Sequence, residues 1–257
     1  MQKKKTILIP AIFLFIIISL SNSYSQDERE NIGNVITLHF QVGGALPAGD
    51  LSKRYGNFLT LGTGMDFITE KNNWLFGWKG DFHFGNSVKE NVLGGLGGVD
   101  GFLFGNGLAS ADDFTLKQRG FYLGAHLGKI IPLSADNTRS GIRLTFGAGL
   151  LQHWIRLQQD PVNFLPQVDD EYGKGYDRLT NGLALRQFIG YQLLGKSKLV
   201  NFLIGFEFIE GFTQNRRSYN FDEMRQDTDK RVDLVLGLKV GWTLPFYVGE
   251  STGEIFY

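Results

Sequence analysis

Hydrophobic and polar residues alternate one by one along most of the chain after Asn34. Every second residue from Val232 to Phe246 is apolar, whereas the positions between them include Asp233, Lys239 and glycines. A period of two places successive side chains on opposite faces of a β-strand. The alternation predicts an all-β chain of eight strands, at residues 34–44, 57–69, 74–85, 119–132, 140–157, 182–194, 198–212 and 231–247.

The composition of the two faces indicates what surrounds the strands. One face is apolar, and the other mixes charged residues with many glycines, among them Gly62, Gly77, Gly149, Gly205 and Gly237. On a solvent-exposed surface these glycines would weaken the strands without any gain in packing. Between long polar side chains they fit the narrow interior of an eight-stranded barrel. We therefore expect the apolar face to point outward into lipid; a soluble barrel or sandwich is the alternative.

The connections between the predicted strands alternate in length. Short turns fall near residues 70–73, 133–139 and 195–197, and long ones at 86–118, 159–181 and 213–230. This alternation is typical of transmembrane barrels, which have short periplasmic turns, long extracellular loops and an even number of strands. The sequence thus predicts an eight-stranded antiparallel up-and-down transmembrane β-barrel.

The first 25 residues have the features of a secretory signal peptide. Lys3, Lys4 and Lys5 precede an apolar run from Ile7 to Leu20, and small residues lie just before Gln26. This run is shorter than the roughly 20 residues with which a helix spans a bilayer. We expect cleavage before Gln26, a barrel domain over residues 26–257, and a location in the outer membrane of a Gram-negative bacterium. An uncut membrane anchor is the alternative.

Overall composition narrows the possible functions of the 257-residue chain. Lys plus Arg and Asp plus Glu both total 26, so the chain has no excess positive charge with which to hold nucleic acid. The chain has no Cys, which excludes disulfides, zinc–thiolate sites and thiol catalysis.

The last predicted strand carries a local signature. Residues 239–246, KVGWTLPF, resemble the signal that the barrel-assembly machinery reads, although the chain continues past Tyr247. The mature chain resembles the small outer-membrane β-barrels of the OmpA and OmpX transmembrane type. Residues 46–51 and 241–247 also resemble segments common in barrels of the Bacteroidota. The resemblance implies a fold and a location, but no activity.

Eight charged residues fall on the inward face of the predicted barrel. Charges in a narrow lumen must be paired and hydrogen-bonded, so we expect an internal ion-pair network that closes the barrel; a conduction path is the alternative. The network consists of Asp66, Lys79, Asp81, Arg143, Arg186, Glu207, Asp233 and Lys239.

The four histidines also face inward by parity. His39, His83, His126 and His153 lie on different strands, and a metal site built from them would need all four at one height. Some eight-stranded outer-membrane barrels resemble lipid A-modifying enzymes, which pair a His with a Ser or an acid, so an enzyme is an alternative. The predicted strand interiors offer no Ser partner. We therefore predict no catalytic residue, no metal and no cofactor.

The long loops contain more apolar and aromatic residues than freely solvated loops do. Such residues are enriched in protein interfaces, and we predict that they bind partner proteins; packing of the loops on one another as a lid is the alternative. The candidate residues are Leu93, Leu96, Phe102, Phe104, Phe164, Tyr172, Tyr176, Arg216, Arg217 and Tyr219.

These features together predict a structural or accessory outer-membrane subunit. It would contact outer-membrane lipid with its apolar wall and the proteins of a larger envelope complex, for secretion or outer-membrane protein assembly, with its loops and wall. A lipid A-modifying enzyme and a narrow small-solute channel are the alternatives.

Overall fold

The alternating segments form one closed barrel, as predicted. The computed structural model describes residues 33–94, 114–159, 170–195 and 200–248. Each strand pairs antiparallel with its neighbour in sequence, and β8 pairs with β1 to close the ring. The strands are β1 (Asn34–Gly49), β2 (Phe58–Ile68), β3 (Trp74–Gly85), β4 (Phe114–Pro132), β5 (Gly141–Gln159), β6 (Thr180–Leu194), β7 (Asn201–Asn215) and β8 (Lys230–Val248).

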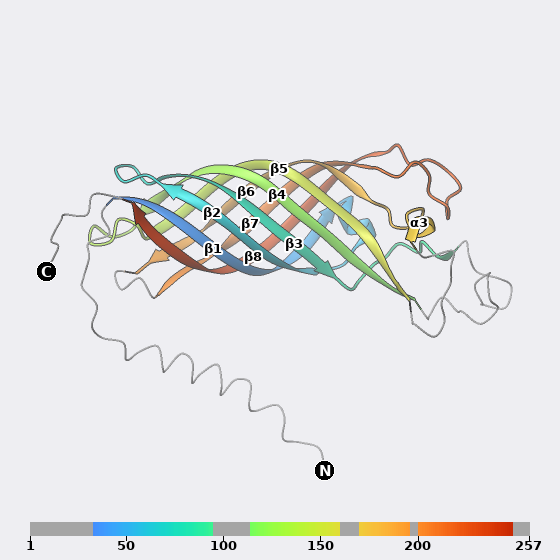
Figure 1. Cartoon of the computed structure of the whole chain (residues 1–257), viewed down its shortest axis with the longest axis horizontal. Helices are drawn as coiled ribbons and strands as arrows, with labels where there is room; N and C mark the ends of the chain where they lie inside the picture. The colour runs from blue at the N-terminus through green and yellow to red at the C-terminus, as the bar shows by residue number, and fades with distance from the viewer. Residues whose placement is uncertain (1–32, 95–113, 160–169, 196–199, 249–257) are drawn as a thin grey trace, which may run out of the picture. The chain divides into compact units, whose positions relative to one another are not determined.

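The connections define two different ends of the barrel. At one end, which we call the turn end, short turns join β2 to β3, β4 to β5 and β6 to β7 (Figure 1). The other end, the loop end, has α2 (Leu51–Arg54), α3 (Asp170–Gly173) and the longer connections. No helix in these ranges is long and apolar enough to cross a membrane.

The strands cross the barrel axis obliquely because their pairing is staggered. Following paired residues round the ring from Leu38 on β1 leads back to β1 at Ala48. This stagger and the tilt of the strands are geometrically linked in a closed barrel (Figure 1). It also brings inward side chains of distant strands to the same height in the lumen.

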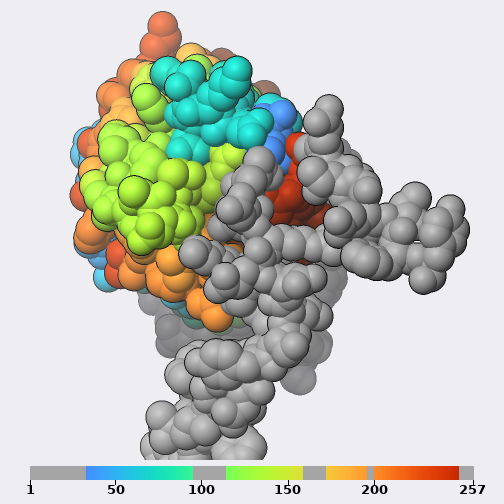
Figure 2. Space-filling view, turned by 90° about the vertical axis from the view of Figure 1, so that its left-hand side faces the viewer, coloured from blue at the N-terminus to red at the C-terminus, as the bar shows by residue number. Residues whose placement is uncertain are grey.

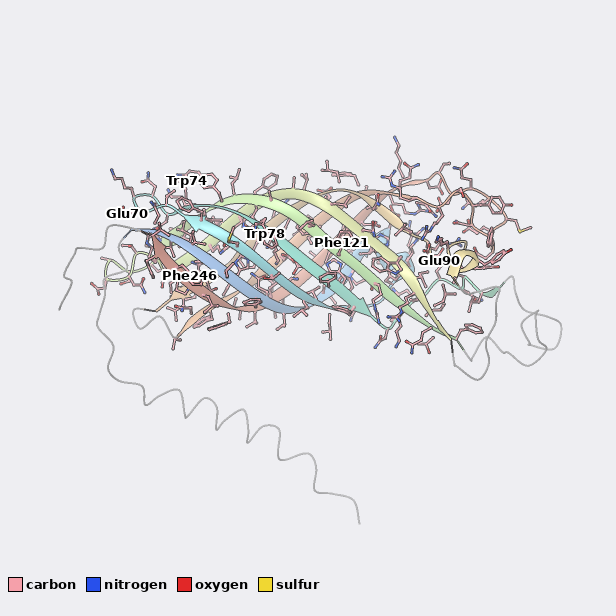
Figure 3. All side chains as sticks on the ribbon, in the orientation of Figure 1. Glu70, Trp74, Trp78, Glu90, Phe121 and Phe246 are labelled. Carbon is pink, nitrogen blue, oxygen red and sulfur yellow. The ribbon has the colours of Figure 1, made fainter. Side chains whose placement is uncertain are left out.

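The outward face of the barrel is an exposed apolar band. Trp78 and Phe246 lie on this wall (Figure 3), and their exposed neighbours include Phe40, Leu61, Phe82, Leu123, Phe146, Ile189, Phe206 and Leu238. Inward positions of the same strands are buried and mostly polar or glycine. A continuous apolar surface round a whole barrel exceeds what soluble monomers expose.

The strand prediction was wrong by five residues at two strand ends near the loops. β1 continues through Pro47 to Gly49, because β8 still pairs with it there. β2 has already ended at this height, so Pro47 interrupts no hydrogen-bond ladder on the β2 side. β4 starts at Phe114 rather than residue 119. In its first residues the polarity of the two faces is reversed: apolar Phe114 is buried inside the barrel, and polar Thr115 is exposed outside. The reversal marks the part of the strand beyond the apolar band.

The turn end is closed by packed turns. Buried Arg139, from the β4–β5 turn, donates to the Thr69 carbonyl and to Asn73 Oδ1, each at 2.7 Å. Figure 2 shows these two turns side by side at this end. Beneath them, an apolar cluster fills the lumen, formed by Val35, Ile68, Leu75, Ile130 and Leu194.

Candidate functional site

The middle of the lumen is filled by five charged side chains, which we call the central cluster: Lys79, Asp81, Arg186, Glu207 and Lys239. Glu207 forms ion pairs with all three cations, at 2.8 Å from Lys79 Nζ, 2.6 Å from Arg186 Nε and 3.1 Å from Lys239 Nζ. Asp81 lies 3.1 Å from Lys79 Nζ and 3.2 Å from Lys239 Nζ. These side chains are buried and come from β3, β6, β7 and β8.

Neutral side chains satisfy the remaining donors of the central cluster. Gln41 Oε1 accepts from Lys79 at 2.7 Å, and Thr60 Oγ1 accepts from Lys239 at 2.6 Å. Gly43 leaves the space that the Lys239 stem occupies, since a Cβ there would lie 2.7 Å from its Cδ. Parity alone placed these residues inward, but it gave no sign that Gln41 and Thr60 are partners of the two lysines.

A second group, the turn-end cluster, surrounds Asp66 nearer the short turns. Arg143 Nη2 lies 2.6 Å and His126 Nε2 2.7 Å from its two carboxylate oxygens, and His39 Nδ1 is 3.4 Å away. Arg143 also donates to Gln192 Oε1 at 2.8 Å. The lumen is therefore occupied by bonded polar groups at a second height.

The eighth predicted lumen residue, Asp233, pairs with His153 towards the loop end. His153 Nε2 is 2.8 Å from Asp233 Oδ2, and its Nδ1 is 3.4 Å from the hydroxyl of Tyr55. Thr213 donates to the same Asp233 oxygen at 2.5 Å. Both ring nitrogens thus face partners, and no Ser hydroxyl in the described ranges contacts this buried His.

The four histidines do not gather in one place in the lumen. His39 and His126 share Asp66, His83 packs on the ring of Phe58 at 5.0 Å between centroids, and His153 faces Asp233. Within the residues that the structure describes, no group of three or more His, Cys, Asp or Glu is arranged to hold a metal ion.

A network of ion pairs links the connections at the loop end, and we call it the cap: Arg54, Glu90, Arg178, Asp222, Asp227 and Arg231. Fully buried Arg178 donates to Glu90 at 2.9 Å and to Asp222 at 2.5 Å. Arg54 Nε lies 3.2 Å from Glu90, and Arg231 Nη2 lies 2.6 Å from Asp227. Glu90 lies at the loop end in Figure 3. The cap joins all four loop-end connections.

The backbone of Arg178 is unusual. Its φ of 51° lies in the left-handed region, which non-glycine residues seldom adopt. Burial acts to lower the pKa of this guanidinium, but Glu90 and Asp222 outweigh that effect and raise the pKa above its usual value. The strained backbone is held because surrounding carboxylates fix the side chain. No sequence pattern distinguishes Arg178 from other charged loop residues.

Apolar side chains fill the mouth of the barrel beneath the cap. Leu51, Tyr55 and Val92 are fully or almost fully buried there, together with two of the residues that we expected to bind a partner, Leu93 and Tyr176. Both side chains pack into the barrel, as the lid alternative describes, and their binding to a partner stays a prediction.

The other predicted partner-binding residues fall into three groups. Arg217 pairs with Asp177 at 2.9 Å and Arg216 donates to Asn181 at 2.6 Å, so both have partners within the chain. Tyr172 and Tyr219 are exposed, at 67% and 39%. The remaining four, Leu96, Phe102, Phe104 and Phe164, lie outside the described residues.

Tyr219 belongs to an exposed group that we call the loop-end patch, with Phe221 and Met224. The Tyr219 and Phe221 rings lie 6.1 Å apart, and Phe221 rests edge-on against buried Tyr176 at 5.6 Å. Met224 is 74% exposed. The ring of Phe221 occupies space that a Cβ on Gly175 would fill. The patch is thus anchored on its inner side and exposed on its outer side.

Acid is expected to loosen the cap. Burial alone would raise the pKa of Asp227, but hydrogen bonds from Arg231 and the Asp229 amide hold it below the usual 3.8. A carboxyl with a lowered pKa stabilises the folded state above its unfolded pKa and loses that effect as pH falls through its folded pKa. Protease resistance of the β7–β8 connection should therefore be constant above pH 5 and fall below about pH 4. Asp227→Asn should weaken that resistance at neutral pH.

Comparisons with known proteins give structural likeness only. No protein family and no curated protein matches the chain. Ail of Yersinia pestis, in complex with the heparin analogue sucrose octasulfate, aligns over 82% of this chain and 99% of its own, with 12% identity and a TM-score of 0.39. A major outer membrane protein of Thermus thermophilus aligns over 81% and 98%, with 12% identity and a TM-score of 0.40.

The outer membrane protein OprG of Pseudomonas aeruginosa aligns over 87% of this chain and 100% of its own, with 13% identity and a TM-score of 0.37. Identities and TM-scores this low carry no information about activity or source. The assignment to eight-stranded barrels rests on the closed ring of strands itself, and the Bacteroidota-like source stays a prediction.

Proposed function

We propose that the protein is a non-catalytic outer-membrane barrel that serves as a structural or accessory subunit of an envelope complex. It binds partner proteins through its exposed loop-end patch and its lipid-facing wall, while its lumen conducts nothing. The observation that carries the proposal is the contrast between a lumen with every predicted charge paired and an outer surface that exposes apolar groups.

The outer wall supports the membrane location. The exposed apolar band encircles the barrel, and beyond it towards the loop end the outward positions become polar, as with Lys117, Arg119 and Arg156. An apolar band bounded in this way matches the hydrocarbon layer of a bilayer and its interface. Lipid is then the first partner of the barrel, and the predicted signal peptide is consistent with export.

The filled lumen supports a role without transport. The central cluster, the turn-end cluster and the His153–Asp233 pair occupy three heights, with apolar packing at both ends. A solute would have to break buried ion pairs at each height, and removing one partner of such a pair costs several kcal/mol. The role must then lie on the outer surface.

The purified full-length chain is expected to produce no single-channel steps in planar lipid bilayers. The lumen is blocked by paired charges rather than by a single movable loop, so voltage should not open it. Recordings with a known open porin, purified and reconstituted in the same way, control for insertion. Reproducible single-channel conductance by the folded wild-type chain would favour the narrow-channel alternative and contradict the proposal.

Removing the loop-end patch is expected to release the partner without unfolding the barrel. The triple substitution Tyr219→Ser, Phe221→Ser and Met224→Ser should lower co-purification of the partner about tenfold or more, since exposed aromatic anchors often contribute about 2 kcal/mol. The variant should still be folded, as shown by unchanged migration of unboiled samples on gels. Leu133→Ser, at an exposed position of the turn end, is the matched control. Equal co-purification by the triple variant would argue against the loop-end patch.

A further inference from the structure

Two polar side chains interrupt the apolar band on one side of the barrel. Gln187 on β6 is exposed, and its cross-strand neighbours are Phe146 on β5 and Phe208 on β7. The outward positions before and after it on β6 are Leu185 and Ile189. Gln187 is therefore surrounded by lipid-facing apolar groups on all four sides.

Glu210 on β7 has a similar setting. Its cross-strand neighbours are Leu185 and Leu234, and Phe208 and Phe212 are the adjacent outward positions on its own strand. The next outward row towards the loop end is again apolar, with Leu183, Phe212 and Val232 all exposed. The carboxylate of Glu210 thus lies inside the apolar band rather than at its polar border.

These two side chains form one patch. Phe208 pairs with Gln187, and Leu185 pairs with Glu210, so Gln187 and Glu210 are diagonal neighbours on adjacent strands. The row continues onto β5 and β4 with Ala148 and Ala125, whose small side chains let another surface approach the wall. We call Ala148, Leu185, Gln187, Phe208 and Glu210 the wall patch.

Neither polar group is satisfied within the chain. Among the described residues, no hydrogen bond or ion pair involves the side chain of Gln187 or of Glu210, whereas all eight predicted lumen charges are paired. A polar group facing hydrocarbon without a partner costs free energy, and charged groups on the lipid face of barrels are destabilising. A partner that supplies donors would remove this cost.

We propose that the wall patch docks a membrane-spanning segment of another protein, which presents a Lys or Arg to Glu210 and a hydrogen-bonding group to Gln187. The negative charge of Glu210 selects a cationic partner. A second copy of this chain fits poorly, because a two-fold interface sets the same patch against itself and brings two carboxylates together. The inference rests on the proposed outer-membrane location and deepens the proposed role.

The test is photo-crosslinking in intact cells, with a photoreactive amino acid at position 187 or 210 of the full-length chain. Leu61 lies on the opposite wall, on β2, and is 52% exposed; the same probe at position 61 is the control. We expect an adduct with one other protein from positions 187 and 210 and not from 61. The crosslinked peptide should belong to a membrane-spanning segment that contains Lys or Arg.

Charge variants test the chemistry of the contact. With the probe at 187, Glu210→Lys should reduce the adduct about tenfold and Glu210→Asp should retain it. Leu61→Gln, which adds an amide to the opposite wall, should leave it unchanged. Migration of unboiled samples on gels identifies any variant that fails to fold. If a charge variant does not fold, the adducts of the otherwise wild-type chain at positions 187, 210 and 61 decide whether the wall patch docks such a segment.

Several results overturn the inference: adducts only with lipid, adducts with a second copy of this chain, equal adducts from position 61, or a partner segment without a cation. Such a result leaves the proposed function standing if the loop-end substitutions still release a partner. Recovery of the protein in the soluble periplasmic fraction would instead refute the proposed function itself.

Discussion

Glu207→Ala is expected to destabilise the folded barrel strongly. Glu207 neutralises Lys79, Arg186 and Lys239 at distances between 2.6 and 3.1 Å. Among the described residues, its removal leaves Lys79 and Lys239 with Asp81 as their only carboxylate partner, and Arg186 with none. Removing one member of a buried ion pair typically costs about 3–5 kcal/mol, because the remaining charge is left uncompensated. The free energy of unfolding, from urea titrations in lipid vesicles, should fall by that amount.

Two further variants isolate the cause of this loss. Glu207→Gln keeps the shape and some hydrogen bonds but removes the charge, so it should be destabilising by a smaller amount. Lys53→Ala breaks the exposed Lys53–Asp50 pair at the loop end, where the lysine side chain is 77% exposed, and should cost less than about 1 kcal/mol. If Glu207→Ala lowers stability no more than Lys53→Ala does, the central cluster does not hold the barrel together.

Phe206→Arg is expected to prevent stable membrane insertion. Phe206 is 66% exposed on the wall, between Ile189 on β6 and Leu238 on β8. A cation at the midplane of the lipid face costs roughly 2–4 kcal/mol. Leu234→Arg should act in the same direction, by a smaller amount because Leu234 lies nearer the loop end. The amount of protein in purified outer membranes measures the effect.

The neighbouring residue provides a test of the opposite face. A Cβ on Gly205 would lie 2.6 Å from the Phe188 ring inside the lumen and would also overlap the Ile189 carbonyl, so Gly205→Leu should also prevent folding. Leu133→Arg, at an exposed position of the β4–β5 turn, should have little effect. Normal accumulation of both Phe206→Arg and Gly205→Leu would mean that the faces are assigned wrongly and that the barrel is soluble.

The sequence alone was sufficient for the strands and their faces, since a period of two is a local property of the chain. Parity placed Glu207 inward and Phe206 outward without knowledge of any partner strand. The prediction missed the start of β4, where the strand has left the apolar band and an apolar residue such as Phe114 points inward. The alternation itself continues there, but the meaning of each face reverses.

Only the tertiary structure determined which groups meet. Lys79 on β3 and Glu207 on β7 are far apart in the ring, and the stagger of the closed barrel brings them to 2.8 Å across the lumen. The cap depends on Arg178 meeting Glu90 and Asp222 from other connections. The alternation in the sequence is a property that each strand satisfies by itself. The pairing of side chains across the lumen depends instead on the register of every strand in the ring, and only the closed barrel determines that register.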